Sequence, residues 1–118
     1  MSGNEYQRLA MRTNDGKALY RLISKIETAE IINAALGLSG EVGEFNDLLK
    51  KWIFHEKEFD ADHAKKELGD IMWYVAMMCH SFGWELDEIL QMNIDKLLAR
   101  YPNGFDVESA NFRKQGDI

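Results

Sequence analysis

Residues that break or cross-link a fold are scarce, with one proline and one cysteine among the 118 residues. A lone cysteine excludes an intramolecular disulfide. Cys79 ends the apolar run 71–79, which predicts a buried thiol. The scarcity of proline and the three- and four-residue spacing of apolar side chains predict an all-α chain. The length favours one domain, residues 1–118.

Clusters of positive charge and long hydrophobic runs are also missing. The formal net charge is −6. Without a Lys- or Arg-rich run, neither a nucleic-acid polymer nor an anionic membrane is expected as a partner. No apolar run reaches the length of a membrane span, and the N-terminus MSGNEYQRLA is too polar for a signal peptide. These absences predict a cytoplasmic protein.

Turn and capping residues divide the chain into helical segments. The first predicted segments are a short helix at 4–13 capped by Asn4, a turn at 13–17 and a helix or connector at about 17–27. A long helix at about 28–54 follows, and then a helix at about 61–82 that is capped by Asp60 or Asp62 and ended by Gly83. The last helix runs from Trp84 or Asp87 to about Arg100, and a turn follows at 101–104. The polar tail, 105–118, is expected to fray or to wrap a neighbouring chain.

Each of the three longer helices carries an apolar stripe that is expected to face a core. The stripes are Leu38, Val42, Phe45, Leu49 and Trp52; then Ala64, Leu68, Ile71, Val75 and Met78; then Leu86, Leu90, Ile94 and Leu97. Gly37, Gly40 and Gly43 interrupt the first stripe at three-residue spacing. Because each Gly costs about 1 kcal/mol against Ala in a helix, they indicate close approach of another backbone or a ligand. A kinked or broken helix is the alternative.

Four carboxylates stand beside these stripes in two pairs, Glu41 with Glu44 and Glu67 with Asp70. Residues three apart on a helix are neighbours, so each pair repels itself. No cation stands three or four residues after any of them, and Lys66 is the one local candidate before Asp70. Paired acids on a solvated helix face are the ordinary alternative. Two such pairs at the stripe edges of successive helices favour a shared site.

If the two helices pack antiparallel, both pairs can meet at the edge of the shared core. Partly buried carboxylates do not stay ionised without compensation. Protonation is one solution, and a hard divalent cation such as Mg²⁺, which takes oxygen ligands, is the other.

These segments resemble the MazG-like branch of the all-α NTP pyrophosphohydrolases, whose signature is E-x-x-E, a spacer and E-x-x-D. Here Glu41-x-x-Glu44 is followed by 22 residues and then by Glu67-x-x-Asp70. The stretches LGLSGEVGEFNDLLKK and KKELGDIMWYVA are similar as well, and NIDKLLARYPNGF at 93–105 resembles the third segment of the family. The resemblance covers about residues 30–105. It implies a MazG-like four- to five-helix bundle completed by homo-oligomerisation.

The resemblance also implies an activity, the hydrolysis of (d)NTPs at the α–β phosphate bond to (d)NMP and pyrophosphate. Glu41, Glu44, Glu67 and Asp70 would bind Mg²⁺, with Mn²⁺ as an alternative ion. One glutamate, Glu41 or Glu44, would also orient or deprotonate the attacking water.

The third segment carries candidate substrate contacts. Asn93, Lys96 and Arg100 fall at i, i+3 and i+7, on one helix face. Lys and Arg bind phosphates, and Asn93 can hydrogen-bond a sugar or a phosphate. The alternative is a polar outer face on which Lys96 and Arg100 pair with Asp95 or with the tail.

Further contacts are expected from the two longest helices. Lys51, and with it Lys50, can reach phosphates. Tyr74 lies four residues after Asp70 and can stack on a nucleobase. Aromatic residues at helical spacing more often belong to a core, and for Trp52 and Trp73 the core is the stronger interpretation.

One copy of the motif set predicts a single-domain member, for which the resemblance implies a homodimer or homotetramer with sites near subunit interfaces. A di-iron bundle would need Glu-x-x-His pairs, which the sequence lacks; Asp60-x-x-His63 is the nearest match. A non-catalytic dimeric helical interaction or nucleotide-binding module is the other alternative, and the presence of all four acids argues against it.

Overall fold

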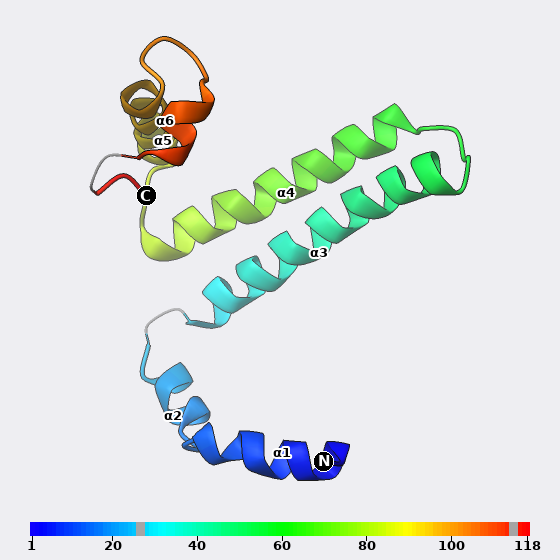
Figure 1. The fold of residues 1–118 in the computed structure, drawn as a ribbon, viewed down its shortest axis with the longest axis vertical. Coiled ribbons are helices and arrows are strands. Elements are labelled where there is room, and N and C mark those ends of the chain that lie inside the picture. The colour runs from blue at the N-terminus through cyan, green and yellow to red at the C-terminus, as the bar shows by residue number, and fades with distance from the viewer. Residues whose placement is uncertain (26–27, 114–115) are drawn as a thin grey trace.

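The computed structural model describes residues 1–25, 28–113 and 116–118. Within these ranges the chain is helical and has no β-strand, which confirms the all-α prediction. The elements are α1 (Gly3–Ala10), the 3₁₀ turn η1 (Met11–Thr13), α2 (Ala18–Ile23), α3 (Thr28–Phe54), α4 (Ala61–Phe82), α5 (Leu86–Arg100) and α6 (Val107–Asn111) (Figure 1). None of these helices is long and apolar enough to cross a membrane.

An antiparallel hairpin of α3 and α4 forms the centre of the molecule (Figure 1). The Asp60 side chain caps α4 by accepting from the backbone N–H of His63 at 3.0 Å. At the other end Gly83 has a left-handed φ of 73°, which a residue without Cβ adopts freely. Both caps and the bounds of the two long helices confirm the sequence prediction.

The segments before α3 differ from the prediction in detail. Asn4 lies inside α1, and Ser2 caps the helix by accepting from the Glu5 N–H at 3.1 Å. The turn at 13–17 is confirmed, with Gly16 at a φ of 71°. The stretch at 17–27 is helical over α2, and its last two residues, 26–27, lie outside the described residues.

The segments after α4 also follow the prediction only in part. Glu85 precedes α5, whose first residue, Leu86, lies between the two predicted starts. The tail contains α6, which the sequence did not predict and which Asp106 caps through the Ser109 N–H at 2.6 Å. The end of the tail returns to α5, where Asp117 pairs with Arg100.

The core between α3 and α4 is thin. Its buried apolar residues are Ala34, Ala64 and Cys79, and the last confirms the predicted buried thiol. Gly37 lies against the ring of Tyr74, where an added Cβ would overlap the ring atoms Cδ1, Cε1 and Cζ. The sequence predicted the close approach of another backbone or a ligand, and at Gly37 a side-chain ring approaches instead. Gly40 and Gly43 have nothing within 4 Å of an added Cβ among the described neighbours.

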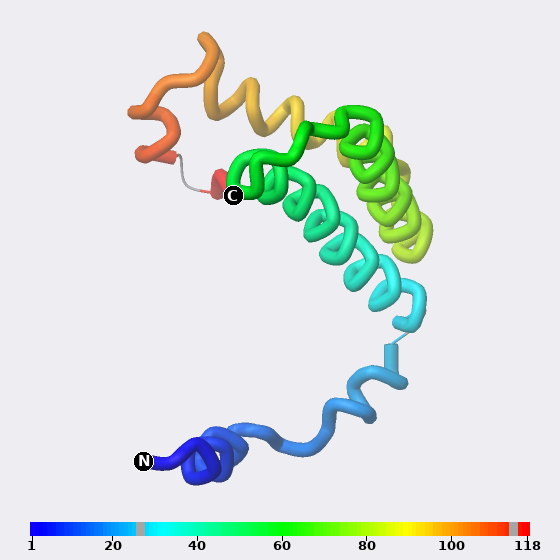
Figure 2. The backbone as a smooth tube through the Cα atoms, turned by 90° about the vertical axis from the view of Figure 1, so that its right-hand side faces the viewer, coloured from blue at the N-terminus to red at the C-terminus, as the bar shows by residue number. Residues whose placement is uncertain are grey.

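The single chain is open rather than compact. Its radius of gyration is 20.3 Å, whereas about 13–14 Å is expected for a compact chain of this length. Figure 2 shows the N-terminal segment and α5 extending away from the hairpin. Leu90, Ile94 and Leu97 are 51%, 51% and 40% exposed, so the prediction that they face inward is wrong within one chain. The physical reason is that α5 makes no extensive contact with the hairpin.

The stripes of the hairpin are half covered for the same reason. Leu38, Phe45 and Leu49 are half-buried, whereas Trp52 and Leu68 remain 48% and 50% exposed. Two helices cover only the side that each turns toward the other. The outer flank of each stripe therefore remains apolar surface in the isolated chain.

Candidate metal centre

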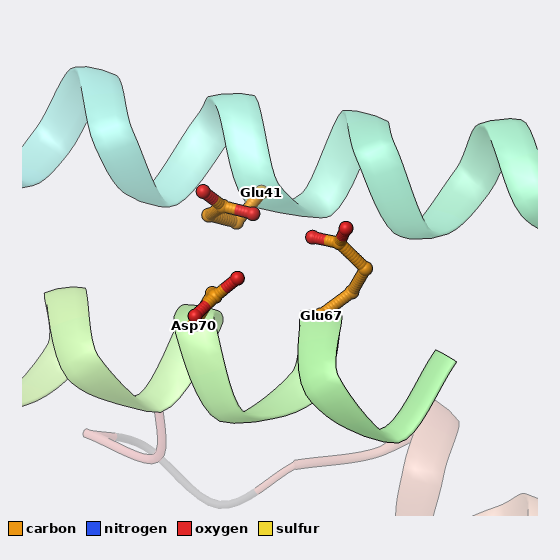
Figure 3. Close-up of side chains that lie close together, drawn as sticks. All are labelled: Glu41, Glu67 and Asp70. Carbon is orange, nitrogen blue, oxygen red and sulfur yellow. The ribbon is translucent and has the colours of Figure 1, made fainter. Parts of the chain in front are cut away.

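Three of the four predicted carboxylates meet across the hairpin. Glu41 projects from α3, and Glu67 and Asp70 project toward it from α4 (Figure 3). One oxygen from each carboxylate lies within 4.8 Å of the others. The antiparallel arrangement brings the middle of α3 beside the first half of α4, as the sequence predicted.

Glu44 lies outside this group. It is exposed, one turn along α3 from Glu41. Because three residues advance a helix by about 300°, the two side chains leave α3 about 60° apart, and only Glu41 faces α4 directly. The predicted fourth carboxylate is thus beside the cluster, and the structure does not bring it into contact with the other three.

The cluster perturbs the titration of Glu41. The neighbouring carboxyl group of Glu67 is the largest cause that raises the pKa of Glu41 to about 7, followed by burial and by the negative charges of Asp70, Glu67 and Glu44. The pKa of Glu41 is raised because the neighbouring acidic groups disfavour its ionised form. The three carboxyl groups lie close together, and a cation bound among them would favour the ionised form of Glu41.

Glu67 is the most buried member, with 9% of its surface exposed. Its Oε1 lies 3.0 Å from Nε2 of His63, one turn earlier on α4. Its Oε2 is buried and has no hydrogen-bond partner within the described part of the chain. A buried carboxylate oxygen without a partner costs free energy, and a ligand at this position would remove that cost.

His63 is the residue that sequence reasoning missed. It was considered only with Asp60 as the nearest match to a di-iron motif, and Asp60 instead caps α4. The available signal was the four-residue spacing from His63 to Glu67, which places the two side chains on one helix face.

The donor set fits a hard divalent cation. Three carboxylates, one of them with an unpartnered buried oxygen, form an all-oxygen environment of excess negative charge. Such sites suit Mg²⁺, Mn²⁺ and Ca²⁺ rather than metals that prefer sulfur or imidazole ligands. The pairing of Asp60 with a backbone N–H and the absence of Glu-x-x-His leave the di-iron alternative without support.

The other predicted contacts on the hairpin already have partners in the chain. The ring of Tyr74 fills the space over Gly37 and meets Trp73 edge-on at a centroid distance of 5.0 Å. Lys51 forms an ion pair with Asp47, with a nitrogen–oxygen distance of 2.7 Å, and this contact lowers the pKa of Asp47. Tyr74 therefore acts in helix packing, and a phosphate at Lys51 would compete with Asp47.

The predicted contacts on α5 lie on a helix that makes no extensive contact with α3 or α4 in the described part of the chain. Arg100 donates to both oxygens of Asp117, through Nε at 2.8 Å and Nη2 at 2.7 Å. This bidentate pair raises the pKa of Arg100 further above its ordinary value and lowers that of Asp117. Asn93 and Lys96 line a hollow of about 570 Å³ beside the same tail. For Arg100, the alternative of pairing with the tail is confirmed.

Comparison with known proteins bears on the same segments. The family model described as "MazG nucleotide pyrophosphohydrolase domain" matches residues 22–105, which include both carboxylate pairs and α5. The chain is also 36% identical over 74 residues to "Gene 37 protein" of Mycobacterium phage L5, a match that covers 58% of this chain and 64% of that protein. It thus spans less than two thirds of this relative. No solved structure gives a significant match. The family match covers more than half of the sequence, and the chain belongs to the MazG nucleotide pyrophosphohydrolase domain family.

Proposed function

We propose that the protein hydrolyses (d)NTPs at the α–β phosphate bond, with Mg²⁺ or Mn²⁺ as cofactor, and releases (d)NMP and pyrophosphate. One observation carries the proposal: Glu67, whose Oε2 is buried without a hydrogen-bond partner among the described residues, meets Glu41 across the hairpin with Asp70 beside it on α4. Membership of the family supports nucleotide pyrophosphohydrolysis as the reaction. The three carboxylates, as oxygen donors, support a hard divalent cation such as Mg²⁺ or Mn²⁺.

Glu41, Glu67 and Asp70 would hold the ion in this proposal. When bound, a divalent cation neutralises negative charge on the phosphate oxygens and makes a bound water more acidic. The three carboxylates orient it, and the low exposure of Glu67 keeps bulk water from that side. Glu44 stands one turn away and completes the proposed set of four, either as a ligand or as a base.

We assign the attacking water to Glu44, with Glu41 as the alternative. Glu44 is exposed and has no place in the three-carboxylate contact, so its oxygens are available to accept a proton. The water oxygen bonds to the α-phosphorus, the bond from that phosphorus to the bridging oxygen breaks, and pyrophosphate leaves. The water proton passes to the glutamate.

The substrate contacts on α5 are proposed to come from another copy of the chain. The solvent-accessible area is 10034 Å², about 3,500 Å² more than a compact monomer of this size exposes. A standard interface buries only about 800 Å² per partner, so the excess fits an extensive, obligate homodimer or homotetramer. In such an assembly Asn93, Lys96 and Arg100 can approach the carboxylates of a neighbouring chain.

Two further substrate contacts belong to the proposal. Lys51 would bind a phosphate by exchanging its ion pair with Asp47. Tyr74 would offer a nucleobase the edge of its ring that does not pack on Gly37.

The experiment is an incubation of the protein with Mg²⁺ and each (d)NTP, with separation of monophosphate, diphosphate, pyrophosphate and orthophosphate. The proposal predicts monophosphate and pyrophosphate in equal amounts, and loss of both in Glu67→Gln. Diphosphate with orthophosphate would refute cleavage at the α–β bond. No turnover with Mg²⁺ or Mn²⁺ would favour a non-catalytic nucleotide-binding or interaction module.

A further inference from the structure

His63 connects the start of α4 to the carboxylate cluster. Its backbone N–H donates to the side chain of Asp60 at 3.0 Å, which fixes the first turn of the helix. From this turn its ring reaches Glu67, with Nε2 at 3.0 Å from Oε1. The backbone of His63 is therefore fixed in the first turn of α4, and its ring contacts the carboxylate cluster through Glu67.

The two oxygens of Glu67 have different surroundings. Oε1 has the His63 ring as a partner, whereas Oε2 is buried without one. The Nε2–H tautomer of the ring is the one that donates to Oε1 in this contact. Figure 3 shows the Glu67 side chain extending from α4 toward Glu41. With Oε1 occupied by the His63 ring, Oε2 is the oxygen of Glu67 that is left for a ligand among the three carboxylates.

We propose that His63 is a positioning residue, whose ring N–H holds Oε1 of Glu67 and thereby fixes Oε2 as the oxygen that faces the metal. The inference rests on the proposed function, because it assigns a role toward the ion held by the cluster. Partners of ligating carboxylates commonly contribute 10- to 100-fold in metal affinity. The His63 side chain is 51% exposed, so water can partly replace it, and we expect a loss near tenfold.

The exposure of the His63 ring also distinguishes a role in positioning Glu67 from a role in the stability of the fold. A side chain half in water contributes little to packing, and the cap of α4 uses the backbone of His63 rather than its ring. Replacement of the ring should therefore weaken metal binding while leaving the unfolding temperature nearly unchanged.

The test is the affinity of the nucleotide-free protein for Mn²⁺, measured by calorimetry together with thermal unfolding. His63→Leu should weaken binding about tenfold, and His63→Gln, which keeps an N–H donor of similar reach, should restore most of it. His80→Leu is the matched control, because His80 is an exposed histidine on the same helix outside the cluster, and it should bind as the wild type does. In turnover, His63→Leu should raise the Mg²⁺ concentration needed for half activity and leave kcat at saturating Mg²⁺ nearly unchanged.

Three results would overturn the inference, and they differ in scope. If the wild type binds Mn²⁺ and His63→Leu binds it equally well, the positioning role is wrong while the metal centre stands. If the wild type binds no Mn²⁺, the metal centre fails and the role of His63 fails with it. A large fall in the unfolding temperature of His63→Leu with unchanged affinity would assign the ring to stability instead.

Discussion

The packing of Tyr74 on Gly37 predicts that two chemically identical substitutions differ in their effect on stability. In Gly37→Ala the new Cβ overlaps the Tyr74 ring, whereas in Gly40→Ala it meets nothing within 4 Å. Each change gains about 1 kcal/mol in helix propensity. Overpacking costs typically 1–3 kcal/mol. Gly37→Ala should therefore range from neutral to about 2 kcal/mol destabilising, and Gly40→Ala should stabilise by about 1 kcal/mol.

The same contact bears on the metal centre. Gly37 lies one turn before Glu41 on α3, and Tyr74 lies one turn after Asp70 on α4. The distance between the helices at this contact therefore helps to set the distance between their carboxylates. Gly37→Ala should weaken Mn²⁺ binding, and Gly40→Ala should not.

The assay is urea unfolding followed by circular dichroism at several protein concentrations, so that assembly and folding are separated. A double-mutant cycle with Tyr74→Leu isolates the contact, because the cost of Gly37→Ala should disappear once the ring is gone. If Gly37→Ala stabilises the protein as much as Gly40→Ala does, the Tyr74 ring does not pack on Gly37. If Gly40→Ala is destabilising, another chain approaches α3 at that position.

Three further predictions follow from charges and exposed surface. Because folding raises the pKa of Glu41 from 4.5 to about 7, the folded metal-free chain binds more protons than the unfolded chain in that window. Its stability should therefore fall as the pH rises from 4.5 to about 7. This fall in stability should be smaller in Glu41→Gln and absent with saturating Mg²⁺. An identical pH profile in Glu41→Gln would contradict the raised pKa of Glu41. If Arg100 serves a substrate phosphate, it must first release Asp117, so Asp117→Asn should lower the KM for nucleotide and Arg100→Gln should raise it. Asp95→Asn, on the same helix as Arg100, controls for the loss of one negative charge. Unchanged KM values in Asp117→Asn and Arg100→Gln would make Arg100 a structural partner of the tail. Ile94→Lys places a charge on the exposed apolar face of α5 and should reduce the assembled mass measured by light scattering; an unchanged mass would show that this face is not an interface.

Much of the hairpin could be predicted because its signals are local. Asp60 and Gly83 mark the ends of α4 through capping chemistry that acts within a few residues. The pairing of Glu41 with Glu67 and Asp70 followed from helical spacing once the two helices were assumed antiparallel. These inferences needed no knowledge of the rest of the chain.

The remaining features depend on contacts that a linear pattern does not contain. An apolar stripe such as that of Ile94 on α5 indicates a face to be covered, but it does not say whether the cover is the same chain or another. The pairing of Arg100 with Asp117 joins residues 17 apart through a tail that carries little periodicity. His63 was missed for a different reason. Its spacing to Glu67 was visible, but only the structure shows that one oxygen of this carboxylate is left without a partner.

The proposed metal centre requires that Glu41, Glu67 and Asp70 share one divalent cation. The most direct test is crystallographic: anomalous diffraction from crystals of the protein soaked in Mn²⁺. We predict one anomalous peak within coordination distance of oxygens from all three carboxylates, including Oε2 of Glu67. Crystals that take up Mn²⁺ elsewhere and leave this position empty would contradict the metal centre and the function proposed from it.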